Sequence, residues 1–198
     1  MKEYQIDSDS DLLELACSLG QPVSSRLNGP LIDTLIPLNK QDAHPQSLSA
    51  NFGANEFPFH TDGAYFPMPP KFIILRYIKG PENPTPTTVC NLTDINDDDK
   101  RLLQHSIWKV RSIKSFYSTI FAQDSSFFRF DNCVMQPLNK ANDNLTIFSD
   151  IIADLPTETI NWRFNKTVII ENWKYLHNRP MVRAEEVNFR TLQRIMVL

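Results

Sequence analysis

Glycine is scarce in this chain, at five of 198 residues, and neither a GxGxxG fingerprint nor a GxxxxGK(S/T) loop occurs. Both motifs use glycine to bring backbone N–H groups close to a phosphate, so their absence excludes the common nucleotide-binding loops. Cysteine is also rare, because Cys17, Cys90 and Cys133 are far apart and form no CxxC pair. Such spacing is typical of reduced thiols in a cytoplasmic protein.

Long apolar runs and an excess of one sign of charge are missing as well. No apolar run reaches the length that spans a membrane, and the polar, acidic start of the chain is unlike a signal peptide. Twenty basic and 23 acidic residues give a net charge of -3, which predicts neither a nucleic acid nor an anionic membrane as partner. We therefore expect one cytoplasmic domain over residues 1–198, with its oligomeric state left open.

Helical periodicity predicts three helices, at 8–19, 94–106 and 145–154. In the first, Leu12, Ala16 and Leu19 fall on one face, and Gly20 follows as a stop signal. The second begins with three consecutive aspartates at 97–99. Acidic residues complement the positive end of a helix dipole, so we interpret them as part of the helix start and not as a metal site.

Strand patterns are more numerous than helical ones. Short alternating or continuous apolar runs predict strands at 31–36, 57–63, 71–78, 87–92, 108–113, 127–135, 159–164, 167–172 and 192–198. The polar stretch 38–50 predicts an exposed loop, and the proline-rich stretch 66–70 cannot be a central strand. The fold class is therefore mainly β with a few helices, most simply a jelly roll with polar groups converging at its open mouth.

Two of the four histidines stand in settings that suit metal binding. His60 and Asp62 are two residues apart in an extended segment, so their side chains project to the same face. His177, from a distant strand, completes a set of two imidazoles and one carboxylate. That set occupies one face of a six-coordinate metal and leaves other positions open, which is the ligand pattern of non-haem Fe(II) oxygenases.

Several strings in the chain together resemble the TauD/TfdA group of Fe(II)- and 2-oxoglutarate-dependent dioxygenases, in the clavaminate synthase-like superfamily. The resemblance spans roughly residues 50–198 and rests on Phe57-Pro58-Phe59-His60-Thr61-Asp62-Gly63, Pro69-Pro70-Lys71-Phe72, Val168-Ile169-Ile170-Glu171-Asn172-Trp173, Leu176-His177-Asn178-Arg179 and Arg190-Thr191-Leu192-Gln193-Arg194. It implies a double-stranded β-helix (jelly roll, cupin-like) in which His60, Asp62 and His177 are the catalytic metal ligands.

The resemblance also implies the cofactors. Fe(II) would be held by the three ligands, 2-oxoglutarate would be the co-substrate, and O2 the oxidant. Arg190, thirteen residues after His177, matches the arginine that binds the distal carboxylate of 2-oxoglutarate. A guanidinium suits that task because it grips a carboxylate through two parallel hydrogen bonds and keeps its charge. With Asp62 present, hydroxylation is expected, with desaturation or ring formation as variants.

Two assignments stay open at this level. Thr87 matches the family's threonine that also touches the 2-oxoglutarate carboxylate, but Thr88 competes with it, and either can be a plain strand residue. Arg194 matches an arginine that some members use against an anionic substrate, and a rim salt bridge explains it equally well. The family's usual Gly-Asp turn before the distal histidine is replaced here by Asn165-Lys166, and asparagine tolerates the left-handed backbone that such a turn needs.

The substrate is expected to be a small molecule, with a carboxylate-bearing, amino-acid-like metabolite favoured because Arg194 offers a counter-charge. Candidate pocket residues are Tyr65, Phe66, Arg76, Arg179 and Arg183. Two other classes remain open. One is a non-catalytic β-barrel module that binds a metal or 2-oxoglutarate, and the other is a zinc hydrolase, because the same three ligands suit Zn(II) with a bound water.

Overall fold

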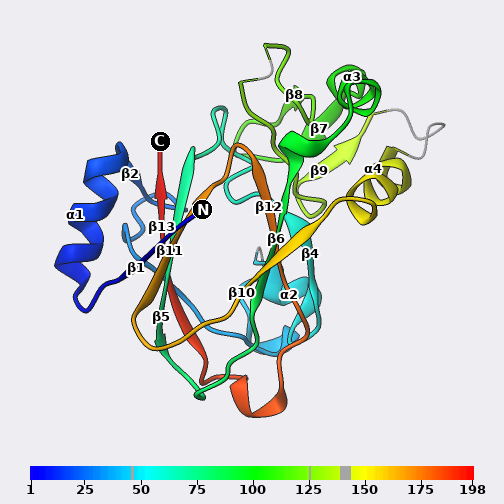
Figure 1. Ribbon diagram of the computed structural model, residues 1–198. Coiled ribbons are helices and arrows are strands. Elements are labelled where there is room, and N and C mark those ends of the chain that lie inside the picture. Colours follow the sequence, from blue (N-terminus) through cyan, green and yellow to red (C-terminus); the bar gives the residue numbers. More distant parts are fainter. Residues whose placement is uncertain (46, 125, 139–143) are drawn as a thin grey trace.

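Two antiparallel sheets face each other in the computed structural model, which describes residues 1–198 except 46, 125 and 139–143 (Figure 1). The first sheet has the order β1-β11-β5-β13-β2, and β3 also pairs with β13. Its strands are β1 (Lys2–Gln5), β11 (Lys166–Glu171), β5 (Phe72–Lys79), β13 (Thr191–Val197), β2 (Pro22–Val23) and β3 (Asp33–Leu35). The second sheet has the order β10-β6-β12-β4. Its strands are β10 (Thr157–Ile160), β6 (Thr87–Asn91), β12 (Tyr175–Arg179) and β4 (Phe57–His60).

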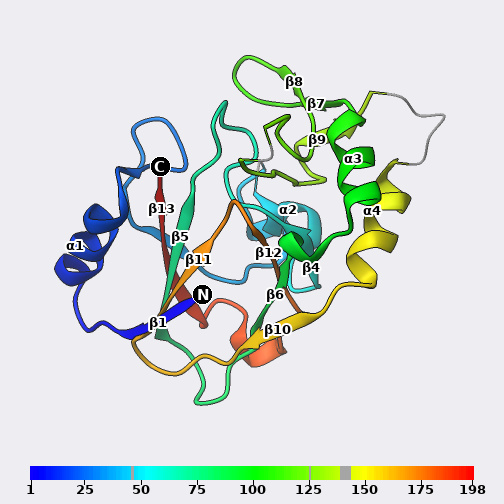
Figure 2. The same cartoon turned by 45° about the horizontal axis from the view of Figure 1, so that its top comes forward.

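A third, smaller sheet has the order β8-β7-β9 and lies beyond one end of the two large sheets (Figure 2). Its strands are β7 (Trp108–Val110), β8 (Phe116–Ser118) and β9 (Met135–Pro137). All strand pairs of the large sheets are antiparallel and neighbours in the sheet are often distant in sequence, as for β13 beside β5. This arrangement confirms the predicted mainly β, jelly-roll fold.

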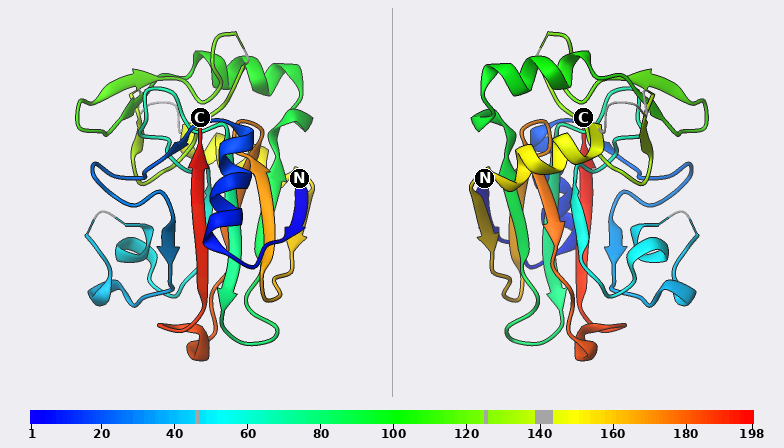
Figure 3. Two further views of the ribbon diagram at one scale, coloured as in Figure 1. Left: turned by 90° about the vertical axis from the view of Figure 1, so that its left-hand side faces the viewer. Right: turned by 90° about the vertical axis from the view of Figure 1, so that its right-hand side faces the viewer.

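The described helices are α1 (Asp9–Leu19), α2 (Leu48–Phe52), α3 (Asp97–His105) and α4 (Asn144–Ala153), with short 3-10 turns η1 (Lys40–Asp42), η2 (Leu92–Asp94) and η3 (Ala184–Glu186). Two of the helices, α1 and α4, lie on the outer faces of the first and the second sheet (Figure 3). The Ser8 side chain accepts a hydrogen bond from the Asp11 N–H at the start of α1, and the Asn96 side chain does the same for α3. None of the described helices is long and apolar enough to cross a bilayer.

Alternation along the strands sorts the core into three hydrophobic clusters. One lies between the two large sheets and includes Leu75, Val89 and Val168. A second lies between α1 and the outer face of the first sheet, and it includes Leu12 and Ile195. The third packs under α3 and α4 on the outer face of the second sheet, where the buried aromatic rings gather; its members include Cys90, Trp108, Phe128, Phe130 and Phe148. The space between the two sheets is therefore lined by every second residue of each strand.

The predicted strand at 127–135 was largely wrong, because only its last residue enters β9. Residues 127–131 have no regular structure apart from one isolated bridge between Phe121 and Phe128, and 132–134 form a turn. The alternation that indicated a strand has another cause. Phe128 and Phe130 pack into the third cluster, while the buried Arg129 donates hydrogen bonds to the carbonyls of a neighbouring loop. The predicted loop at 38–50 also contains η1 and the start of α2.

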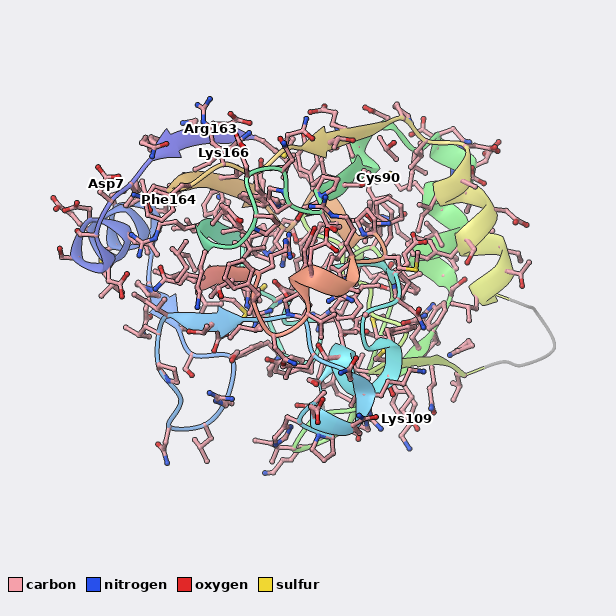
Figure 4. The ribbon with its side chains drawn as sticks, turned by 90° about the horizontal axis from the view of Figure 1, so that it is seen from below. Asp7, Cys90, Lys109, Arg163, Phe164 and Lys166 are labelled. Atoms are coloured by element: carbon pink, nitrogen blue, oxygen red, sulfur yellow. The ribbon has the colours of Figure 1, made fainter. Side chains whose placement is uncertain are left out.

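Asn165 makes the turn before β11 without glycine, as expected. Its φ is 62°, in the left-handed region that asparagine tolerates better than most residues. The Asn165 amide donates a hydrogen bond to the Asp7 carboxylate at 2.6 Å, which ties the turn to the segment before α1. Seen from below, Asp7, Phe164 and Lys166 lie together at this side of the molecule, whereas Cys90 lies toward α3 and α4 (Figure 4).

Replacing Leu12 with alanine tests the packing of α1 on the first sheet. Leu12 is fully buried, so the change should lower the free energy of unfolding by about 2–5 kcal/mol through lost burial and the cavity that remains. Chemical denaturation measures this loss. Leu27→Ala is the matched control, because Leu27 is 83% exposed and its removal should change stability by less than about 0.5 kcal/mol. Equal losses in the two variants would contradict the placement of α1.

Candidate metal centre

Strand register brings the two candidate histidines together. β12 pairs with β4 so that His177 stands directly opposite His60, and their rings lie 4.4 Å apart. On the other side of β12, His177 stands opposite Val89 of β6, a member of the cluster between the sheets. Paired residues of an antiparallel sheet point to the same face, so both imidazoles face the interior. Asp62 follows His60 by two residues, just beyond the end of β4.

The ligand atoms of these three side chains lie close enough together to share one ion. Among the His, Cys, Asp and Glu residues that the structure describes, this is the group with that property. Their ligand atoms all lie within 4.8 Å of one another, and all three residues are buried. His60 Nδ1 lies 2.8 Å from the Pro58 carbonyl oxygen, so it carries the proton and leaves Nε2 as the free ligand atom. His177 Nε2 lies 3.7 Å from Asp62 Oδ2. The set fits an ion that accepts two imidazoles and one carboxylate.

The charges of the site favour metal binding. Burial alone would raise the pKa of Asp62, but the nearby Arg194, His177 and His60 outweigh it, and the pKa lies below its ordinary value. Burial, helped by the neighbouring His60, lowers the pKa of His177 to about 3. The site therefore presents a carboxylate and a neutral imidazole near pH 7, the protonation states that a metal ion requires.

The backbone around Asp62 is held from two sides. The buried Asn172 side chain accepts a hydrogen bond from the Asp62 N–H and donates one to the Asp62 carbonyl, both at 3.0 Å. Between the two ligands, Thr61 pairs with Phe130, because the Thr61 N–H donates to the Phe130 carbonyl and the Phe130 N–H donates to the Thr61 hydroxyl. The ligand segment is thus fixed by contacts with two distant parts of the chain.

Arg190 is almost fully buried, at 2% exposure, and directly precedes β13. Its Nε lies 3.7 Å from the Glu186 carboxylate, and its Nε and Nη2 have no hydrogen-bond partner among the described residues. Burial lowers the pKa of Arg190 to about 10, so the guanidinium stays charged near pH 7. A buried cation with free N–H groups is the arrangement that a ligand carboxylate would complete.

The two threonines point in opposite directions. Thr87 and Val89 alternate with Thr88, and Val89 lies between the sheets. Thr87 therefore faces the interior, where its hydroxyl accepts a hydrogen bond from Trp162 Nε1 at 3.1 Å. Thr88 stands opposite Asn178 on the other face of the sheet. Of the two, only Thr87 shares the face that carries the candidate ligands.

Arg194 lies in the interior and not at a rim. Its Nη1 donates to Asp62 Oδ1 at 2.6 Å, and its Nη2 donates to Asp33 Oδ2 at 2.8 Å. Both carboxylates outweigh the effect of burial and raise the pKa of Arg194. Arg194 is thus directly bound to one of the candidate metal ligands.

Tyr65 and Arg179 lie near the centre but are engaged by protein groups. The Tyr65 hydroxyl donates to the Ser25 carbonyl at 2.5 Å, and burial raises its pKa to about 12. Phe66 stacks on Tyr65, with ring centroids 4.9 Å apart. Arg179 donates to the carbonyls of Gly53 and Asn55 and lies 3.6 Å above the Phe57 ring. Arg179 therefore anchors the segment before β4.

Two other arginines that the sequence suggested as anion contacts have structural roles. Arg76 pairs with Gln193, so it stands on the opposite face of the first sheet from Arg194. There it bonds the Ser8 carbonyl and the Asp9 carboxylate at the start of α1. Arg183 bonds the Glu186 carboxylate at 2.7 Å and lies half exposed. Neither side chain reaches the candidate ligands.

The structure adds two acidic residues that sequence patterns did not single out. Asp33 is buried and bonded to Arg194, as described above. Asp131 follows Phe130, the partner of Thr61, and lies close enough to interact with the charges of His60 and Asp62. Burial raises the pKa of Asp131. The position of Asp131 was not predicted because 127–135 was expected to be a strand. Asp33 carried no local sequence signal, because it pairs with Arg194 across 161 residues.

Comparisons with known proteins place the fold. No family model matches this chain, and no curated protein matches its sequence. Solved structures do match. One is an asparagine oxygenase in complex with Fe(II), (2S,3S)-3-hydroxyasparagine and succinate, with a TM-score of 0.73, 19% identity and 96% of this chain covered. Another is the non-haem iron oxygenase OrfP with Fe, succinate and (3S)-hydroxy-L-arginine, with a TM-score of 0.71, 15% identity and 94% of this chain covered.

A further structure of OrfP, with Fe and alpha-ketoglutaric acid, matches with a TM-score of 0.70, 17% identity and 94% of this chain covered. The chain spans between 63% and 65% of the length of these structures. At such low identity the likeness establishes the fold alone, which this chain shares with the asparagine oxygenase and with OrfP.

Replacing His177 with alanine should abolish tight metal binding, because it removes one of the three candidate ligands. An anaerobic titration with Co(II), followed by its visible absorption, should show an affinity at least about 100-fold weaker than that of the unchanged chain. His105→Ala is the matched control, because His105 ends α3 on the outer face and should leave the affinity unchanged. Equal affinity in the unchanged chain and in His177→Ala would show that the ion binds elsewhere.

Proposed function

We propose that residues 1–198 form a single domain of a non-haem Fe(II)- and 2-oxoglutarate-dependent oxygenase that hydroxylates a small, amino-acid-like substrate. The observation that carries the proposal is the buried triad of His60, Asp62 and His177 in the same interior as the buried Arg190 with unbonded N–H groups. The triad alone suits several metals, but a buried cation with free donors between the same two sheets calls for an anionic co-substrate.

The protein's part in the reaction is to bind and orient. His60, Asp62 and His177 would hold Fe(II) and leave its remaining positions open. Arg190 would bind the distal carboxylate of 2-oxoglutarate, and the Thr87 hydroxyl, which faces the same interior, would be a second contact. When bound, Fe(II) and 2-oxoglutarate supply the oxidative decarboxylation in which O2 hydroxylates the substrate and releases succinate and CO2. As a ligand, Asp62 would fill the position that a halide needs, which favours hydroxylation.

The charged groups beside the triad support an amino acid as substrate. Arg194 presents a guanidinium next to Asp62, and its Nε, which has no hydrogen-bond partner among the described residues, could meet a carboxylate. Asp131, which lies near His60 and Asp62, makes no ion pair with any described residue and could meet an ammonium group. A zwitterion carries both charges that this arrangement complements. The matched asparagine oxygenase and OrfP hold hydroxylated amino acids, which agrees with this substrate class.

A zinc hydrolase and a non-catalytic binding module use fewer of these features. Hydrolysis at a bound Zn(II) gives no role to a buried arginine whose donors await a carboxylate. A non-catalytic binding module would explain Arg190. It would give no role to a metal site whose three ligands leave coordination positions open for O2. Metal content and dependence on 2-oxoglutarate separate the three functions.

The 2-oxoglutarate site can be tested without knowing the substrate. Under anaerobic conditions, Fe(II) followed by 2-oxoglutarate should produce a visible metal-to-ligand charge-transfer band. In Arg190→Gln, the 2-oxoglutarate concentration for half of the full band should rise about 10-fold or more, because a charge-assisted, bidentate contact is lost. Arg163→Gln is the matched control, since Arg163 is exposed. No band in the unchanged chain, with Fe(II) bound, would contradict the proposed co-substrate.

The substrate class can be tested with a panel of the free amino acids, scored by substrate-dependent succinate release. We expect release with one or a few zwitterionic members and none with their N-acetyl derivatives. For an accepted substrate, Asp131→Asn should raise KM about 10-fold or more without changing the 2-oxoglutarate requirement, because an ion-paired contact to the ammonium weakens. The control is Asp124→Asn, an exposed acid on the same loop. Turnover of neutral compounds alone would remove the amino-acid assignment.

A further inference from the structure

Asp33 is the feature of the centre that neither the sequence motifs nor the proposed co-substrate explains. It lies on β3, at the edge of the first sheet, and stands opposite Arg194 in the strand register. The residue is 8% exposed, and both of its carboxylate oxygens are used. Oδ2 accepts from Arg194 Nη2 at 2.8 Å, and Oδ1 accepts from the Ser25 hydroxyl at 3.0 Å.

We propose that Asp33 is a positioning residue for the metal centre, acting on the ligand Asp62 through Arg194. The inference rests on the metal site of the proposed function, and it does not depend on which substrate is used. Arg194 bridges the two carboxylates, with one terminal nitrogen on each. Because Asp33 fixes the far side of the guanidinium, the near side is fixed against Asp62 Oδ1.

The contact decides which oxygen of Asp62 a metal can use. Oδ1 is bonded to Arg194, whereas Oδ2 is the oxygen that faces His177 Nε2, at 3.7 Å. A metal between the two histidines would therefore take Asp62 through Oδ2, as a ligand with one oxygen. Freed from Arg194, the carboxylate could rotate about its side-chain bonds and present either oxygen or both. Hydrogen bonds to a ligating carboxylate orient it in this way in metal sites generally.

Asp33 also balances charge. A guanidinium bonded to a metal ligand repels the dication that the ligand must bind, and this repulsion is strong in a buried site. Asp33 places a negative charge directly against that guanidinium, so the pair adds little net charge beside the metal. Without the charge of Asp33, Asp62 would be the one remaining carboxylate in an ion pair with Arg194 among the described residues. Loss of position and loss of charge balance therefore both weaken metal binding.

The link continues away from the metal. The Ser25 residue that donates to Asp33 also accepts, at its carbonyl, a hydrogen bond from the Tyr65 hydroxyl. Tyr65 follows Asp62 by three residues. Hydrogen bonds and the chain itself thus close a ring from Asp62 through Arg194, Asp33, Ser25 and Tyr65 back to Asp62. This ring connects the edge strand β3 to the segment that carries His60 and Asp62, so the position of Asp33 depends on Ser25 and Tyr65 as well as on Arg194.

The test compares metal affinity in Asp33→Asn, Asp33→Glu and the unchanged chain, by anaerobic Co(II) titration without 2-oxoglutarate or substrate. Asp33→Asn keeps the size and a hydrogen-bond acceptor but removes the charge. We expect its Co(II) affinity to fall about 10–100-fold, with a changed visible absorption spectrum of the bound ion. Asp33→Glu restores the charge and should recover most of the affinity. Asp9→Asn is the matched control, because Asp9 pairs with Arg76 on the opposite face of the same sheet.

Three results would overturn the proposal: wild-type affinity and spectrum in Asp33→Asn, failure of Asp33→Glu to recover affinity, or an equal loss in Asp9→Asn. The first would mean that Asp33 serves substrate alone, and the last that any lost arginine partner in this sheet has the same effect. Thermal unfolding of each metal-free variant shows whether the chain is folded. Failure of the metal site itself is distinguishable, because the unchanged chain would then bind Co(II) no better than His177→Ala.

Discussion

The centre depends on the register of β12 between its two neighbours. With His177 opposite His60 on one side and Val89 on the other, one strand position sets the direction of both imidazoles and of Thr87. A slip of one residue would turn His177 to the outer face, into the cluster that holds Leu176 and Cys90. The apolar alternation that buries those residues therefore also fixes the metal site, so stability and chemistry rest on the same pairing.

Charge in the interior is balanced in two groups. Arg194 lies between Asp33 and Asp62, and Arg190 lies beside the fully buried Glu186, which also accepts hydrogen bonds from the Thr85 N–H. Each arginine lies beside a carboxylate of this chain, which lowers the cost of burying its charge. The difference lies in the free donors: Arg190 Nη2 has no partner among the described residues, whereas both terminal nitrogens of Arg194 are bonded. A ligand anion is therefore better accommodated at Arg190.

Local patterns were sufficient for α1, β5, β11 and the segment around His60, because each has an apolar period or a capping residue that depends on near neighbours. The resemblance carried by short strings gave three candidate metal ligands and Arg190, and the structure brings them into one interior. What sequence could not predict were contacts between distant residues. The choice of Thr87 over Thr88 required the strand pairing, and the bonds from Arg194 to Asp33 and Asp62 span 161 and 132 residues.

The segment at 127–135 shows why a pattern can mislead at a functional site. Its alternation of phenylalanine with polar residues is real, but Phe128 and Phe130 face a hydrophobic cluster, whereas Arg129 donates to carbonyls of the loop that follows Asp62. Thr61, between His60 and Asp62, uses its backbone and its hydroxyl to bond Phe130, so the next residue, Asp131, is carried to the metal centre. In a regular strand, the N–H and carbonyl of Phe130 would bond a neighbouring strand. Because the backbone here is irregular, these groups bond Thr61 instead.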